Sequence, residues 1–158
     1  MEFPPLPGGC VCGAVRYQLT ADPVTLYACH CTDCQTATGS SFALSMIVNR
    51  DAVALVRGDP ELHECRLDAG REKRSFRCRA CNTTLWGAPS RFPNLLNLNP
   101  GTLDDTSWLR PVGHIWTRSA QSWFALPEGV LRYEGQPDDM LPLVRAWKSR
   151  TGRERSDP

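Results

Sequence analysis

The chain has 158 residues, 41% of them hydrophobic, and a formal net charge of +1 at pH 7. This length fits one domain with its own core, and the near-neutral charge argues against nucleic-acid and membrane partners. No apolar run is long enough to cross a bilayer, and the N-terminal MEFPPLPGG, with an acidic residue and three prolines, is not typical of a signal peptide. We therefore expect a cytoplasmic protein.

Short segments of alternating apolar and polar residues predict a mainly β chain. Residues 41–48, for example, place Phe42, Leu44, Met46 and Val48 on one face. The other expected strands are 15–19, 24–28, 53–57, 61–67, 73–78, 84–87, 94–99 and 112–117. Because most of them are short and separated by turn residues, we expect a single-domain antiparallel fold with little helix.

Helix is expected in two places. Residues 32–39, TDCQTATG, predict one short helix that Thr32 caps and Gly39 ends. Residues 141–148 predict one or two helical turns before a basic tail. The expected organisation is therefore an extended arm at 1–7, a β domain at 8–140, and a C-terminal helical turn and tail at 141–158.

Seven of the eight cysteines lie in three tight groups, which indicates metal binding. The groups are C-x-C at Cys10 and Cys12, C-x-C-x-x-C at Cys29, Cys31 and Cys34, and C-x-x-C at Cys78 and Cys81. Thiolates two or three positions apart on a turn converge on one cation, and zinc suits sulfur ligands in a tetrahedron. A disulfide framework, a thioredoxin-like dithiol and an iron–sulfur cluster are the competing interpretations.

The count of seven suggests two sites. A structural zinc takes four protein ligands, whereas a catalytic zinc takes three and keeps one position open. Spacing alone does not decide which pairs combine, so a single four-cysteine site with three spare thiols is also open. Arg77 and Arg79 flank Cys78, and they are expected either to donate to the sulfurs or to line the wet face of a strand.

Four segments together resemble the glutathione-dependent formaldehyde-activating enzyme (GFA) family. These segments are GGCVCGAVRY, CHCTDCQTATG, FRCRACNTTLW and HIWTRSAQSWFAL, in that order between Gly8 and Pro137. The resemblance implies a β-tent fold, a structural zinc on Cys10, Cys12, Cys78 and Cys81, and a second zinc on Cys29, Cys31 and Cys34. Asn82 stands where the family usually has Gly, and Asn also tolerates the left-handed backbone of such a turn.

The resemblance also implies an activity: carbon–sulfur bond chemistry on a small thiol adduct, such as that of glutathione with formaldehyde. Three thiolates make zinc a weak Lewis acid, so capture of a thiol is favoured over activation of water. We therefore expect a zinc-dependent carbon–sulfur lyase-type enzyme with a small-molecule thiol partner. The alternative is a non-catalytic zinc module that binds a protein or carries metal or thiol.

Several other residues are candidates for the same site. His30 lies between two of the cysteines, and on an extended segment its side chain points away from both. It is a candidate for proton transfer, and His114, Trp116 and Trp123 are candidates for the pocket wall. Gln35 and Thr36 follow Cys34 and are expected to donate hydrogen bonds near the site, while Cys65 is expected to be a buried structural thiol.

Overall fold

A computed structural model of the chain describes residues 3–151 and confirms the mainly β prediction. The chain forms two compact units, described separately below. The first unit comprises residues 3–23 and 46–109, and the second comprises 24–45 and 110–151. Strand β4 (Ala43–Asn49) passes from the second unit into the first. No helix among residues 3–151 is long and apolar enough to span a membrane.

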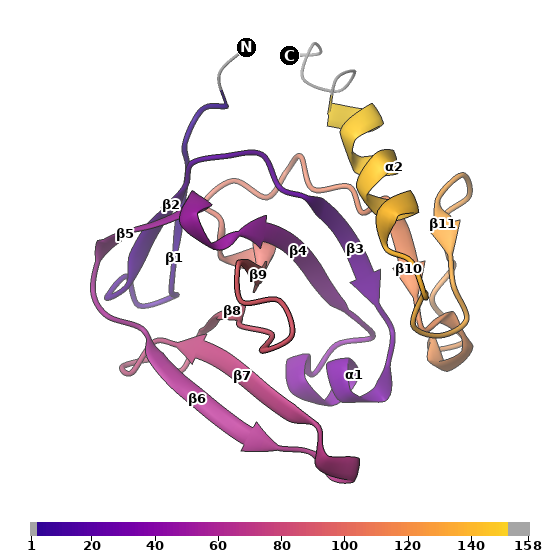
Figure 1. Cartoon of the computed structure of the whole chain (residues 1–158), viewed down its shortest axis with the longest axis horizontal. Helices are drawn as coiled ribbons and strands as arrows, with labels where there is room; N and C mark the ends of the chain where they lie inside the picture. Colours follow the sequence, from indigo (N-terminus) through magenta and orange to yellow (C-terminus); the bar gives the residue numbers. More distant parts are fainter. Residues whose placement is uncertain (1–2, 152–158) are drawn as a thin grey trace. The chain divides into compact units, whose positions relative to one another are not determined.

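Antiparallel pairing organises the first unit. One sheet has the order β1-β2-β5, formed by β1 (Leu6–Gly9), β2 (Arg16–Leu19) and β5 (Val53–Arg57). The other strands run in the order β4-β9-β8-β7-β6, with bounds β6 (Glu61–Arg66), β7 (Glu72–Arg77), β8 (Thr84–Gly87) and β9 (Leu95–Leu98). Figure 1 shows β6 and β7 as a long hairpin. Short 3-10 turns occur at Arg50–Ala52, Asp68–Gly70 and Pro100–Thr102.

The core of the first unit is built around Tyr17. Its ring meets the ring of Trp86 edge to face at 5.6 Å, and both side chains are buried. The Tyr17 hydroxyl donates to Thr102 Oγ1 at 2.7 Å, while Thr102 donates onward to the Asn99 carbonyl at 2.7 Å. The buried phenol is therefore satisfied, as a polar atom in an apolar core must be.

In the second unit, parallel pairing replaces the expected antiparallel pairing. Strand β10 (Gly113–Ile115) pairs in parallel with both β3 (Thr25–Cys29) and β11 (Leu131–Arg132). Parallel neighbours need long connections, and more than 80 residues separate β3 from β10, so alternation within each strand could not reveal this pairing. All five residues of β3 are buried, which is typical of a strand covered on both faces.

Two helices complete the second unit. Helix α1 (Thr32–Thr38) follows β3 directly, and α2 (Leu141–Thr151) packs beside β3 (Figure 1). The backbone of α2 accepts a hydrogen bond from Thr25 at the Leu143 carbonyl, and the Leu143 and Trp147 side chains are buried. A short 3-10 turn occurs at Thr117–Ser119.

Most element boundaries match the sequence prediction within two residues, and β5 and β8 match it fully. The predicted helical turns at 141–148 extend to Thr151. Of the expected basic tail, residues 152–158 lie outside the described part of the chain, as do residues 1–2 of the expected N-terminal arm.

Candidate metal centres

In the first unit, four cysteine sulfurs come together from two turns. Cys10 and Cys12 lie between β1 and β2, whereas Cys78 and Cys81 lie between β7 and β8. The four Sγ atoms are all within 4.8 Å of one another, with Cys10 and Cys12 3.5 Å apart and Cys12 and Cys78 3.8 Å apart. Zinc–sulfur bonds of about 2.3 Å in a tetrahedron place the sulfurs roughly 3.8 Å apart. This four-cysteine cluster therefore fits a tetrahedral zinc ion.

The backbone of both turns folds back to aim the sulfurs inward. The Gly13 N–H donates to the Cys10 carbonyl at 3.0 Å, and the Asn82 N–H donates to the Cys78 carbonyl at 2.9 Å. Gly13 and Asn82 both have positive φ, 75° and 58°. Asn82 thus adopts the left-handed backbone expected of the usual glycine, at a cost that Asn bears better than most residues.

The hydrogen-bond donors of the four-cysteine cluster are not the two arginines considered above. The Val15 N–H donates to Cys10 Sγ at 3.2 Å, and the Thr83 hydroxyl lies 3.1 Å from Cys81 Sγ. Arg77 instead donates to Ser75, and Arg79, whose side chain is 67% exposed, pairs with Glu61 at 3.6 Å. Arg79 is thus an exposed residue of the turn between β7 and β8 and not of a strand face, whereas Arg77 is the last residue of β7.

The thiols of the four-cysteine cluster have different pKa values: that of Cys81 is lowered and that of Cys12 is raised. The side-chain and backbone hydrogen bonds from Thr83 lower the pKa of Cys81 to about 5. At Cys12 the Ala14 backbone lowers the pKa, but proton sharing with Cys81 and Cys10 outweighs it and raises that pKa to about 12. The Thr83 hydrogen bonds therefore favour the thiolate form of Cys81, which is the form that binds soft metal ions.

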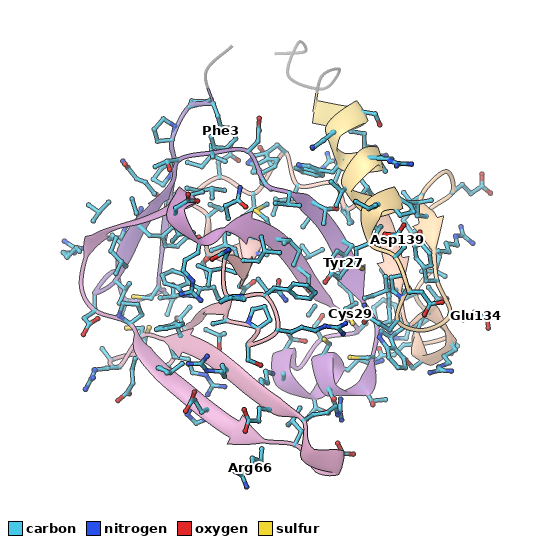
Figure 2. The ribbon with its side chains drawn as sticks, in the orientation of Figure 1. Phe3, Tyr27, Cys29, Arg66, Glu134 and Asp139 are labelled. Atoms are coloured by element: carbon cyan, nitrogen blue, oxygen red, sulfur yellow. The ribbon has the colours of Figure 1, made fainter. Side chains whose placement is uncertain are left out.

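In the second unit, three further cysteine sulfurs converge where β3 meets α1. Cys29 is the last residue of β3, Cys31 is the residue before α1, and Cys34 lies in its first turn. Their Sγ atoms are all within 4.8 Å of one another. Figure 2 shows Cys29 near the end of β3 that leads into α1. Among residues 3–151 no other Cys, His, Asp or Glu joins either cluster. The three-cysteine cluster therefore offers three donors, the number that an open zinc site takes from protein.

The helix cap at the three-cysteine cluster differs from the prediction. Cys31, not Thr32, caps α1, because its sulfur accepts a hydrogen bond from the Cys34 N–H at 3.4 Å. Sequence reasoning favoured Thr because hydroxyls are the usual capping groups. Burial raises the pKa of Cys31, an effect that this N–H only partly offsets. Gly39 ends the helix in the left-handed conformation, as predicted.

His30 points away from the cysteines and into a closed aromatic box. Its Nε2 lies 2.8 Å from Nδ1 of His114, and neither ring is more than 2% exposed. The rings of Phe42 and Phe124 pack against His30 at 5.3 and 5.2 Å. Burial lowers the pKa of both histidines, that of His114 to about 4, so the pair is neutral at pH 7.

The peptide of His30 is fixed as firmly as its side chain. Its carbonyl accepts hydrogen bonds from Gln35 Nε2 at 2.8 Å and from the Ser119 hydroxyl at 2.9 Å. Gln35 Nε2 also donates to the Ser119 carbonyl at 2.8 Å. The residue between Cys29 and Cys31 is therefore held from both sides, by α1 and by the segment after β10. Sequence reasoning indicated Gln35 but missed Ser119, whose partner lies 89 positions away.

The comparisons with known proteins agree with these two clusters. The profile of the family described as glutathione-dependent formaldehyde-activating enzyme matches residues 5–119, which contain all seven clustered cysteines. The chain belongs to this family.

A curated relative covers nearly the whole chain. A protein of Halomonas elongata, named as a candidate glutathione-dependent formaldehyde-activating enzyme, is 25% identical over 157 residues, covering 94% of this chain and 98% of the relative. A crystal structure of a Rhodobacter sphaeroides protein is similar with a TM-score of 0.50 at 17% identity, covering 81% of this chain and 99% of that chain. The latter likeness concerns the fold alone.

The remaining sequence candidates of this GFA-family chain lie in different surroundings. Trp123, a candidate for the pocket wall, is 71% exposed and lines a surface cavity together with Gln35 and Thr36. Trp116 has φ 57°, and the Arg118 guanidinium lies over its ring at 4.7 Å. Cys65 is half-buried on β6, opposite Lys73 of β7, rather than buried, because both faces of this hairpin strand are largely open.

Proposed function

We propose that this chain is a zinc-dependent carbon–sulfur lyase-type enzyme that acts on the adduct of a small thiol and an aldehyde. The observation that carries the proposal is the three-cysteine cluster, which supplies three sulfur donors and no fourth from residues 3–151. A zinc ion bound there would offer its remaining position to the sulfur of an incoming thiol. Cys29, Cys31 and Cys34 are the reactive site, and Cys10, Cys12, Cys78 and Cys81 hold a structural zinc.

The reaction is balanced without any redox partner. In the cleavage direction the carbon–sulfur bond of R–S–CH2–OH breaks, the electron pair remains on sulfur, and the hydroxyl oxygen keeps its bond to carbon as a carbonyl. The hydroxyl proton leaves to solvent or to the departing sulfur, so the products are R–SH and formaldehyde. The reverse direction forms the adduct. Stabilising the partial negative charge that the sulfur carries in the transition state lowers the barrier in both directions.

The protein groups around the three-cysteine cluster orient rather than react. The neutral His30–His114 pair and the two hydrogen bonds to the His30 carbonyl fix the turn that carries Cys29 and Cys31. Because Phe42 and Phe124 pack against the buried imidazoles, we assign both histidines a positioning role. A pH–rate profile that shifts when His30 is substituted would instead support proton transfer through His30.

The family name supports glutathione as one candidate thiol, and the Halomonas elongata relative carries the same description. Free thiol ligands also suit a reducing compartment, which supports a cytoplasmic location. The second candidate function is a zinc module that carries a thiol or metal without catalysis. It is favoured by one chemical fact, that thiols add to formaldehyde unaided.

Exchange spectroscopy by NMR tests the proposal at equilibrium. Zinc-loaded protein is added to formaldehyde and each of a panel of thiols, glutathione included, and the rate of adduct exchange is measured. We expect the wild-type chain to accelerate exchange for at least one thiol, Cys34→Ser to return it to the buffer rate, and the control Cys65→Ser to leave it unchanged. Equal rates with the wild-type chain and with buffer for all thiols would support the carrier instead.

A further inference from the structure

A cavity in the second unit lies beside α1 and is lined only by uncharged residues. Its volume is about 550 Å³, within the usual range for a small-molecule site. Gly39 forms part of its edge, and the side chains around it are Gln35, Thr36, Ser40, Ser41, Gln121 and Trp123. The cavity therefore offers amides, hydroxyls and one indole ring.

Trp123 presents a fixed aromatic face to this cavity. The side chain is 71% exposed, yet its Nε1 donates to Gln121 Oε1 at 2.7 Å and its ring meets Phe124 edge to face at 6.0 Å. An indole that is both exposed and held in one orientation binds a flat apolar surface without first losing conformational entropy. The C–H face of a sugar ring is such a surface, and it carries the partial positive charge that the π face attracts.

The hydroxyls of the cavity are available for hydrogen bonds. Within residues 3–151 the side-chain oxygens of Thr36, Ser40 and Ser41 form none, whereas the amides are already committed. Gln121 Nε2 donates to Gln35 Oε1 at 3.1 Å, and Gln35 Nε2 donates to the His30 carbonyl. The wall is thus rigid, and its free groups are hydroxyls that both donate and accept.

The same hydrogen bonds connect the cavity to the three-cysteine cluster. Gln35 lines the cavity, directly follows Cys34 in α1, and holds the peptide between Cys29 and Cys31. A thiol whose sulfur is bound at the cluster would therefore extend past α1 with the rest of its structure. The cavity is open to solvent, and no cation lines it to pair with a carboxylate, whereas a neutral polyol needs only the hydrogen-bonding groups that the lining offers.

We propose that this cavity binds a neutral, hydroxyl-rich, sugar-like group of the substrate thiol, stacked on Trp123. This inference rests on the proposed function for its link to the thiol, but the ligand chemistry follows from the cavity itself. A thiol with a sugar-like body is consequently preferred over glutathione, which carries two carboxylates.

The test uses the zinc-loaded full chain and fragments that have no thiol. N-acetylglucosamine is the neutral probe, S-methylglutathione is the dicarboxylate probe, and choline is the cationic probe. Each is titrated into the wild-type chain while the NMR signal of the Trp123 indole N–H is followed, and isothermal titration calorimetry gives the affinity of the wild-type chain and of every variant. We expect only N-acetylglucosamine to shift that signal. Trp123→Ala should weaken its binding about tenfold, as should Thr36→Val combined with Ser40→Ala.

Phe92→Ala is the matched control, because Phe92 is also exposed, at 53%, but lies in the first unit. It should leave binding unchanged. Binding of S-methylglutathione or choline at Trp123 in preference to N-acetylglucosamine, or the absence of any shift with N-acetylglucosamine, would overturn the inference.

The two proposals fail separately. Cys34→Ser removes a donor of the three-cysteine cluster but should retain N-acetylglucosamine binding. If no thiol–aldehyde exchange is accelerated while the sugar still binds at Trp123, the proposed function fails and the ligand assignment stands. If glutathione exchange is accelerated and the sugar does not bind, the ligand assignment fails alone.

Discussion

Nε2 of His30 lies 2.8 Å from Nδ1 of His114, so the residue between two cluster cysteines is joined by its imidazole to the neighbouring parallel strand. One nitrogen of this contact donates and the other accepts, which requires that at least one ring be neutral. The outer nitrogen of His114, Nε2, is buried and forms no hydrogen bond within the described residues, whereas the Ser41 backbone is a partner for the charged form of His30. Protonating His114 would therefore bury a charge without a partner.

This contact predicts an acid-sensitive stability. Burial, with the charge of His30 as a smaller cause, lowers the pKa of His114 from 6.5 to about 4. Between these values the unfolded chain binds more protons than the folded chain, so the stabilisation is complete above pH 6.5 and is lost as the pH falls towards 4. We expect the free energy of unfolding to fall by about 1 kcal/mol per pH unit between pH 6 and 5.

His114→Gln should remove most of this slope, because Gln retains hydrogen-bonding groups but does not titrate in that range. Thermal unfolding at pH 7, 6 and 5, with zinc content measured in the same samples, compares the two proteins. Parallel pH dependence in the wild-type chain and the variant would show that this pair does not titrate with folding.

The four-cysteine cluster should stabilise the first unit. Cys78→Ser replaces a buried sulfur donor, so we expect loss of one zinc per chain and a fall in Tm on the order of 10 °C. Cys65→Ser is the matched control, since Cys65 belongs to neither cluster, and it should change Tm by less than about 2 °C. A Cys78→Ser protein with unchanged zinc content and Tm would contradict the assignment.

Asn82 tests the backbone of the turn that carries Cys78 and Cys81 of the four-cysteine cluster. Because its φ is 58°, Asn82→Gly should be neutral or slightly stabilising, whereas Asn82→Val should destabilise by about 1–3 kcal/mol. Chemical denaturation of the zinc-loaded proteins measures both changes. A Val variant as stable as the wild-type chain would mean that this turn relaxes without strain.

Gln35 is expected to act on the reaction through the His30 peptide. Gln35→Leu has a similar volume but loses the hydrogen bond to the His30 carbonyl, so we expect kcat to fall about tenfold while zinc content is retained. Thr32→Ala, in the same helix but outside the cap contact, is the control and should change kcat little. Loss of zinc in Gln35→Leu would instead indicate that the amide is needed to assemble the cluster.

The sequence predicted what depends on local spacing. Short strands, the Gly39 helix end and the left-handed Asn82 follow from residues that are neighbours in the chain. The parallel pairing of β10 with β3, the approach of Ser119 to the His30 carbonyl, and the contact between His30 and His114 join residues more than 80 positions apart. Such contacts depend on the tertiary structure, so they cannot be predicted from the propensities of single residues.

The Cys31 helix cap and the hydrogen-bond donors to the cysteine sulfurs were not predicted, for a chemical reason. Cys31 was overlooked as a helix cap because hydroxyls are the common capping groups, and Arg77 and Arg79 were considered as donors because they are charged. The donors that the structure provides, the Val15 N–H and the Thr83 hydroxyl, are a backbone group and a neutral side chain. Backbone donors leave no signature in residue type.

The most direct measurement is the adduct exchange rate of zinc-loaded Cys31→Ser beside the wild-type chain, with zinc counted in the same samples. If the three-cysteine cluster is the reactive centre, the wild-type chain holds two zinc ions and accelerates exchange, while the variant holds one and does not. A variant that keeps both the second zinc ion and the wild-type exchange rate would show that the chemistry lies elsewhere.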